Sequence, residues 1–119
     1  MTSPARPWTR FYPPATPVEL GPLKYPHMPA AIRDASATYG KKLAFTLGLP
    51  NGSQGSLTFE DADRLSDQFA VYLREVAGFK AGDRVAIQMP NCLAYPIAVF
   101  GMLKAGIVMA NTNPLYTPA

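Results

Sequence analysis

The side chains best suited to metal binding or nucleophilic chemistry occur singly in this sequence. His27 is the only histidine, and no second histidine or cysteine stands near it to complete a metal-ligand spacing. Cys92 is the only cysteine, so no internal disulfide can form. Because Cys92 opens a long apolar run, we interpret it as a small buried hydrophobic side chain. We interpret His27 as an ordinary surface or turn histidine.

Four carboxylates lie close together and could suggest a paired general acid and base. Glu60, Asp61 and Asp63 fall in the first turn of a predicted helix, where negative charge complements the helix dipole. We therefore interpret the four carboxylates as dipole partners and as a solvated helix face; they are Glu60, Asp61, Asp63 and Asp67.

A glycine- and serine-rich stretch at residues 48–56, GLPNGSQGS, has a composition found in phosphate-binding loops. It lacks the lysine that follows in a P-loop, and it joins two predicted strands instead of opening onto a helix. A hairpin turn is the better interpretation. The serines have no base at a recognisable spacing, so nucleophilic catalysis has no support; they are Ser3, Ser36, Ser53, Ser56 and Ser66. We predict no catalytic, cofactor-binding or metal-binding residue in this chain.

The length, composition and net charge of the chain limit the classes of protein to which it can belong. The chain has 119 residues, enough for one small domain or a piece of a larger one. It is 48% apolar and 16% charged, which excludes a disordered chain. The net charge is +3, and basic and acidic side chains are mixed beyond residue 28, which argues against a nucleic-acid partner. Contact with an anionic membrane surface stays open as an alternative. One cysteine and no secretory signal predict a cytoplasmic protein.

The chain divides into a front segment and a globular remainder. Eight of the 13 prolines precede residue 30, so residues 1–28 are predicted to be extended and to lie along a surface. Its candidate anchors are Trp8, Phe11, Tyr12, Val18 and Leu20. Residues 29–119 form the second unit, which starts with a short helix over 29–39 that Gly40 ends.

The next elements are a hairpin and an amphipathic helix. Residues 43–49 alternate like a strand, and residues 56–59 supply the returning strand. A helix is predicted over 59–77, with Thr58 as N-cap and Asp61 completing an acidic capping box. Apolar residues recur along it at helical spacing, and Gly78 follows as its stop.

Residues 84–111 have the pattern of a strand, a helix and a second strand. This pattern predicts a parallel βαβ unit, so the predicted fold class is α/β. The strands are 84–89 and 107–111, and the connecting helix is 92–105. Residues 92–110 are long enough to be mistaken for a membrane span, but Pro96 and Gly106 divide them into helix and strand. The apolar strands predict a sheet covered on both faces. Because nothing follows to pair with the final strand, we expect a truncated piece of a longer protein.

Two stretches of the sequence resemble the adenylate-forming enzymes, the superfamily of acyl-CoA synthetases and related ligases. Leu57-Thr58-Phe59 with the helix after it is similar to the family's first core motif, and residues 103–114 are similar to the second. The opening segment, with Pro7-Trp8 and Tyr12-Pro13, resembles bacterial long-chain fatty-acyl-CoA synthetases, as do residues 111–117, NTNPLYT. Two features depart from that group: residues 14–16, where Gly-Val is usual, and Ala119, where a charged helix usually continues.

The resemblance covers about residues 7–118 and implies a two-step ligase reaction in the parent enzyme. A fatty-acid carboxylate attacks ATP, with Mg²⁺, to give acyl-AMP and pyrophosphate, and coenzyme A then displaces AMP. The resemblance implies that both motifs are scaffold and that Lys104 closes a helix, so no catalytic residue is carried over. We expect this fragment alone to be inactive. The alternatives are a fragment of another acyl- or aryl-CoA ligase, a module pairing with a full-length synthetase, and a homodimer built on residues 1–28.

Overall fold

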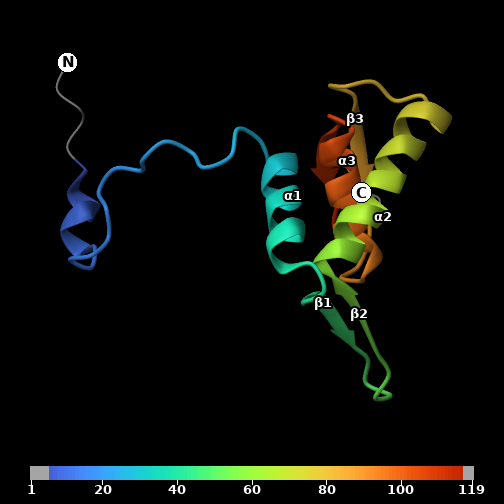
Figure 1. Ribbon diagram of the computed structural model, residues 1–119, viewed down its shortest axis with the longest axis horizontal. Coiled ribbons are helices and arrows are strands. Elements are labelled where there is room, and N and C mark those ends of the chain that lie inside the picture. Colours follow the sequence, from blue (N-terminus) through green and yellow to red (C-terminus); the bar gives the residue numbers. More distant parts are fainter. Residues whose placement is uncertain (1–5, 117–119) are drawn as a thin grey trace.

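The computed structural model describes residues 6–116. Three α-helices, a 3-10 helix, a π-helical turn and four strands follow in order along this part of the chain (Figure 1). They are η1 (Pro7–Phe11), α1 (Met28–Tyr39), β1 (Leu43–Gly48), β2 (Gln54–Thr58), α2 (Phe59–Val71), η2 (Tyr72–Val76), β3 (Arg84–Ile87), α3 (Ala94–Lys104) and β4 (Val108–Asn111). The predicted hairpin, amphipathic helix and parallel strand–helix–strand unit are therefore confirmed.

Local sequence signals set the ends of α1. His27 is its N-cap, and the Nδ1 atom of His27 accepts a hydrogen bond from the backbone N–H of Ala30 at 3.2 Å. Pro29 occupies the first turn, where its missing N–H costs nothing. Gly40 ends the helix with a φ of 34°, which a residue with a Cβ rarely adopts. The interpretation of His27 as a turn residue holds, with capping as its local role.

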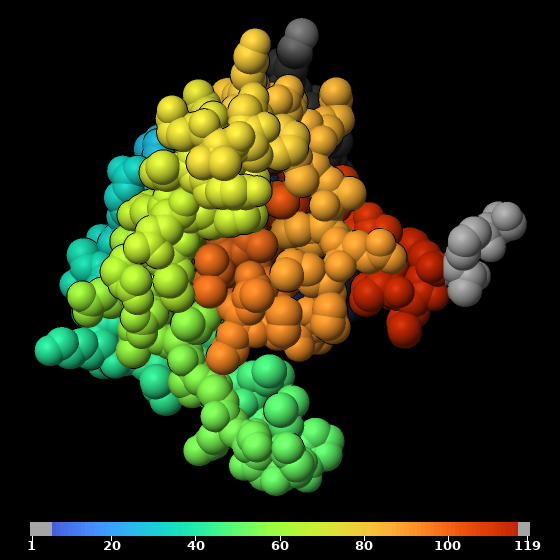
Figure 2. Space-filling view, turned by 90° about the vertical axis from the view of Figure 1, so that its right-hand side faces the viewer, coloured from blue at the N-terminus to red at the C-terminus, as the bar shows by residue number. Residues whose placement is uncertain are grey.

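The hairpin of β1 and β2 is antiparallel, with an irregularity between Leu43 and Phe45, and its green surface projects from the rest of the molecule in Figure 2. Its tip is closed by hydrogen bonds from the Leu49 N–H to the Ser53 carbonyl and from the Gly52 N–H to the Leu49 carbonyl. Gly52 has a φ of 83°, the conformation that such turns demand. The glycine- and serine-rich stretch is therefore a hairpin turn, as predicted.

Thr58 caps α2 as the sequence predicts. Its hydroxyl oxygen accepts a hydrogen bond from the Asp61 N–H at 3.0 Å, and the hydroxyl donates to the Asp61 carboxylate at 2.8 Å. The Thr58 hydroxyl and the Arg64 guanidinium hold the pKa of Asp61 below its ordinary value. The helix continues through the π-helical turn η2, and Gly78, with a φ of 76°, ends it.

Replacing Thr58 with alanine is expected to raise the pKa of Asp61 toward its ordinary value and to cost about 1 kcal/mol of stability through the lost cap. Since the folded pKa lies below the unfolded one, the contribution of Asp61 is present above about pH 4 and is lost as pH falls through the folded pKa. An NMR titration of the Asp61 carboxyl in both proteins measures the shift. Thr46→Ala, at an exposed hydroxyl of β1, is the control, and an unchanged Asp61 titration in Thr58→Ala would contradict the assignment.

Strands β3 and β4 are parallel and pair from Arg84 with Val108 to Ile87 with Asn111. Helix α3 packs against α2 and contacts β4, and it contributes Ala98 and Met102 to the core. Other core residues come from η2, β3 and the turn before β4: Leu73, Ile87, Ala105 and Ile107. None of the helices in the described part of the chain is long and apolar enough to cross a membrane.

Two predictions are wrong for the described residues. The parallel sheet is covered on one face only, because Arg84, Ala86, Val108 and Ala110 are exposed on the other.

The front segment does not lie along the body: Figure 1 shows it reaching away, with η1 at its far end. Proline disfavours long helices but fits the first turn of a 3-10 helix. The proline content predicts an extended segment, but it does not determine whether another part of the chain offers a surface against which that segment can pack. The candidate anchors are exposed, from 40% for Tyr12 to 90% for Leu20.

Candidate functional site

The carboxyl ends of β3 and β4 open into a crevice of about 340 Å³. Ile87 and Met89 form its apolar part, and the remaining lining is polar but uncharged: Asn91, Tyr95, Asn111, Thr112, Asn113 and Tyr116. Parallel sheets bind ligands at this edge, because strand ends and the following loops leave a hollow there. The topology thus marks the crevice as the candidate binding site of this part of the chain.

Hydrogen bonds within the crevice fix its polar groups. The Tyr95 hydroxyl donates to Oδ1 of Asn111 at 3.0 Å, and Oδ1 of Asn113 accepts from the Leu115 N–H at 2.9 Å. Amide and phenol groups can position a ligand by donating and accepting hydrogen bonds, but they carry no positive charge that would neutralise a phosphate. The crevice can therefore bind and orient a ligand, and its lining contains no carboxylate, histidine, lysine or arginine.

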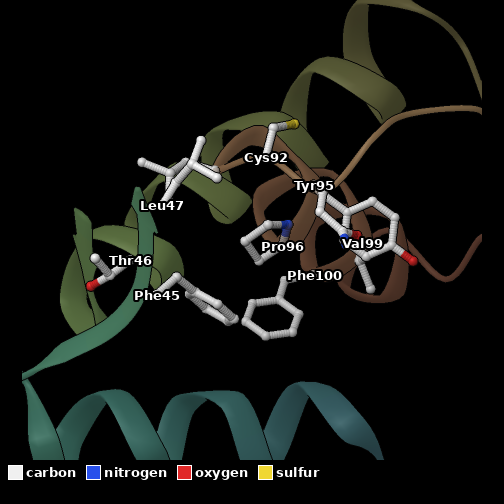
Figure 3. A pocket seen from close by; sticks show the side chains of 10 residues that line it. Phe45, Thr46, Leu47, Cys92, Tyr95, Pro96, Val99 and Phe100 are labelled. Carbon is white, nitrogen blue, oxygen red and sulfur yellow. The ribbon is translucent and has the colours of Figure 1, made fainter. Parts of the chain in front are cut away.

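A second hollow, of about 340 Å³, lies between the hairpin and the start of α3 and is almost wholly apolar. Figure 3 shows Phe45 of β1 facing Phe100 of α3, and their ring centroids are 6.1 Å apart. Cys92 lines the same hollow and is half-buried. The interpretation of Cys92 as a small buried hydrophobic side chain is confirmed for its apolar surroundings but not for full burial, and α3 begins two residues later, at Ala94.

Among residues 6–116, Lys104 is the strongly buried charged side chain of an ion-pair cluster, with 3% of the side chain exposed. It is the last residue of α3, as predicted, and its Nζ atom pairs with the carboxylates of Asp63 and Asp67 on α2. The Nζ–Oδ1 distance to Asp67 is 2.8 Å, and Nζ also donates to the Asp63 carbonyl at 2.8 Å. The interpretation of Asp63 as part of a solvated face is therefore wrong, because only 20% of its side chain is exposed.

The turn after α3 is held from α2 as well. Arg74 donates to the Ala105 carbonyl at 3.0 Å, and Ala105 is 3% exposed. Gly106 has a φ of 75°, so a side chain there would be strained. The local sequence gives no sign of the Arg74 contact, because Ala105 lies 31 residues further along the chain.

The remaining candidate residues are not brought together. Ser66 is fully buried and donates to the Asp63 carbonyl, and Ser56 pairs with Thr46 on the hairpin. Ser36 and Ser53 lie at the end of α1 and in the hairpin turn, and Ser3 lies outside the described residues. Among residues 6–116, no group of three His, Cys, Asp or Glu side chains could hold a metal ion. The prediction that the chain holds no catalytic residue stays a prediction.

The chain is similar to known proteins in sequence and in fold. The family model described as AMP-binding enzyme matches residues 32–119. A curated long-chain-fatty-acid–CoA ligase of Salmonella typhimurium is 40% identical over 112 residues, which cover 93% of this chain and 19% of the relative. The ligase of the same name from Haemophilus influenzae is 53% identical over 62 residues, covering 52% of this chain and 11% of the relative.

Solved structures show the same fold. A fatty acyl-adenylate ligase from L. pneumophila superposes with a TM-score of 0.69 at 23% identity, over 76% of this chain and 16% of that one. The α/β unit seen here is thus a part of the fold of adenylate-forming enzymes. The chain belongs to the AMP-binding enzyme family, and it spans about one fifth of the length of the Salmonella relative.

Proposed function

We propose that this chain is the amino-terminal scaffold of a long-chain fatty-acid–CoA ligase. The observation that carries the proposal is the 40% identity to curated ligases of that name over almost the whole chain. The parent reaction would join a fatty acid to coenzyme A through acyl-AMP, with consumption of ATP and Mg²⁺ as its metal ion.

The two family motifs support a scaffold role, because each closes a structural element here. Thr58 in the first motif caps α2. In the second motif Lys104 ties α3 to α2, and Gly106 makes the turn into β4. These positions serve the framework through capping, a buried ion pair and a positive φ, and such roles require no contact with substrate.

We expect the isolated chain not to catalyse the reaction. Phosphoryl and adenylyl chemistry needs preorganised charge around the nucleotide, and the crevice at the ends of β3 and β4 is lined by uncharged groups. Purified chain incubated with ATP, Mg²⁺, palmitate and coenzyme A should form no more acyl-CoA than a control without protein. Acyl-CoA above that control would contradict the proposed inactivity.

A chimera tests the scaffold role directly. The matched stretch of the Salmonella ligase would be replaced by residues 7–118 of this chain, and palmitoyl-CoA synthesis would be measured. Because cores tolerate many substitutions when volume and pattern are kept, we expect activity within about tenfold of the parent ligase. The same chimera carrying Gly101→Val is the matched control and should lose activity. A chimera that folds and binds ATP but makes no acyl-CoA would refute interchangeability, and a preference for aryl acids would favour the aryl-CoA ligase alternative.

Homodimerisation through residues 1–28 is a second proposal, and the cytoplasm is its proposed setting. The exposed apolar side chains of the front segment favour an intermolecular contact. Light scattering of the chain over a concentration series would detect a dimer, and a version beginning at Tyr25 would remain monomeric. A dimer that survives this deletion would place the contact elsewhere.

A further inference from the structure

The crevice at the carboxyl ends of β3 and β4 combines an apolar wall with polar groups that carry no charge. Ile87 and Met89 form the wall, and the other lining residues supply amide, hydroxyl and phenol groups. Its volume of about 340 Å³ is at the lower end of the range for ligand pockets, so it can hold one part of a larger molecule. The ligand part that matches this lining is uncharged, with polar groups set on an apolar skeleton.

Two asparagine side chains are fixed in the crevice with the same end engaged. Oδ1 of Asn111 accepts a hydrogen bond from the Tyr95 hydroxyl at 3.0 Å. Oδ1 of Asn113 accepts one from the Leu115 N–H at 2.9 Å. Because these oxygens are engaged within the chain, the NH2 groups are left to bind a ligand, and an NH2 group donates. The crevice therefore favours a ligand that offers carbonyl oxygens as acceptors.

Coenzyme A is the substrate of the proposed reaction that contains such a segment. Its pantetheine part is uncharged and carries amide carbonyls between methyl and methylene groups. The triphosphate of ATP needs cationic partners, and a long acyl chain needs a lining without polar groups; the lining of the crevice offers neither. Adenine is matched less well, because asparagine recognises it through its amide oxygen and nitrogen together, and both oxygens are already engaged.

We propose that the crevice binds the pantetheine part of coenzyme A, with the NH2 groups of Asn111 and Asn113 donating to its amide carbonyls. This inference rests on the proposed function, because the parent reaction supplies the choice of ligand. It gives the chain a part in binding a substrate in addition to its part as a scaffold. It also goes beyond the prediction from the sequence, which assigned no cofactor-binding residue to this chain.

Asparagine-to-aspartate substitutions test the donor role. Asn111→Asp and Asn113→Asp keep the oxygen that accepts within the chain and replace the NH2 donor by a second oxygen of similar size. Saturation-transfer NMR of the whole chain with reduced pantetheine should give a dissociation constant on the order of 1 mM, as expected for a small uncharged ligand. Each substitution should weaken this binding by about fivefold, the usual effect of one lost hydrogen bond.

Asn51→Asp is the matched control. Oδ1 of Asn51 likewise accepts from a backbone N–H, that of Ser53 in the hairpin turn, so the same exchange is made away from the crevice. It should leave pantetheine binding unchanged, and far-UV circular dichroism would verify the fold of each variant. A lack of saturable binding by the parent chain would overturn the proposal, as would equal weakening by Asn51→Asp and Asn111→Asp. Adenosine that binds more tightly than pantetheine, and is weakened by Asn111→Asp, would also overturn it.

The Salmonella chimera separates this inference from the proposed function. In an active chimera, Asn111→Asp should raise the KM for coenzyme A by about fivefold and leave the KM values for ATP and palmitate unchanged. A KM for coenzyme A that does not respond would overturn the assignment of the crevice while the proposed function stands. An inactive chimera would count against the proposed function alone, because pantetheine binding by the isolated chain still decides what the crevice binds.

Discussion

Replacing Gly101 with valine is expected to destabilise the chain by about 2–3 kcal/mol, near the upper end of the usual cost of overpacking. Gly101 lies in α3 where this helix approaches α2. A Cβ at this position would be 2.7 Å from Cδ1 of Phe69 and 3.1 Å from the Ser66 backbone oxygen. The Phe69 ring can rotate, but the backbone oxygen cannot move unless α2 shifts. The helices would have to separate.

Urea unfolding followed by far-UV circular dichroism measures this effect. Gly48→Val is the matched control, because no atom lies within 4 Å of a Cβ at that exposed strand position. It should be neutral or slightly stabilising, since valine favours strands. If both variants lose the same stability, the close approach of α2 and α3 is not what requires glycine at position 101.

Replacing Lys104 with methionine is expected to cost about 3 kcal/mol, the lower end of the range for breaking a buried ion pair from one side. Methionine keeps much of the apolar volume but removes the cation and its hydrogen bond to the Asp63 carbonyl. The Asp63 carboxylate would then be largely buried without a partner. The expected loss lies at the low end because Asp67, the second partner, is 59% exposed and can be solvated.

Two further variants assign this loss to the ion pair. Asp67→Asn should cost less than about 1 kcal/mol, as exposed pairs usually do. Asp63→Asn in the Lys104→Met background should recover part of the stability, because the neutral amide leaves no unpaired charge. Urea unfolding of the parent, Lys104→Met, Asp63→Asn and the double variant completes a double-mutant cycle for positions 63 and 104. Additive effects of the changes at 63 and 104 would contradict a direct interaction between them.

Much of the local structure could be predicted because its causes lie within a few residues. Thr58 precedes a helix with Asp61 three positions on, and the structure shows that cap. Gly40, Gly78 and Gly106 each stand after a helical pattern, and each has a positive φ. The parallel pairing of β3 with β4 also followed, because a helix separates two apolar strands.

The candidate site was much less predictable. The crevice lining comes from β3, the loop after it, α3 and the residues around and after β4, and its polar members carry no charge that would attract notice. Amides and phenols scattered over residues 91–116 have no distinctive spacing, so a search for acids, bases and metal ligands passes over them. Their common location follows from the carboxyl ends of parallel strands meeting at one edge.

The order of elements, their caps and stops, and membership of the AMP-binding family could be read from the amino-acid sequence, since these depend on periodicity, single special residues and short motifs. The pairing of Lys104 with Asp63, 41 residues away, and the need for glycine at position 101 became visible in the folded chain alone. The same is true of the exposed face of the sheet and of the exposed side chains of the front segment. A local hydrogen bond depends on neighbouring residues, whereas contacts between distant residues depend on the combined packing of the whole chain.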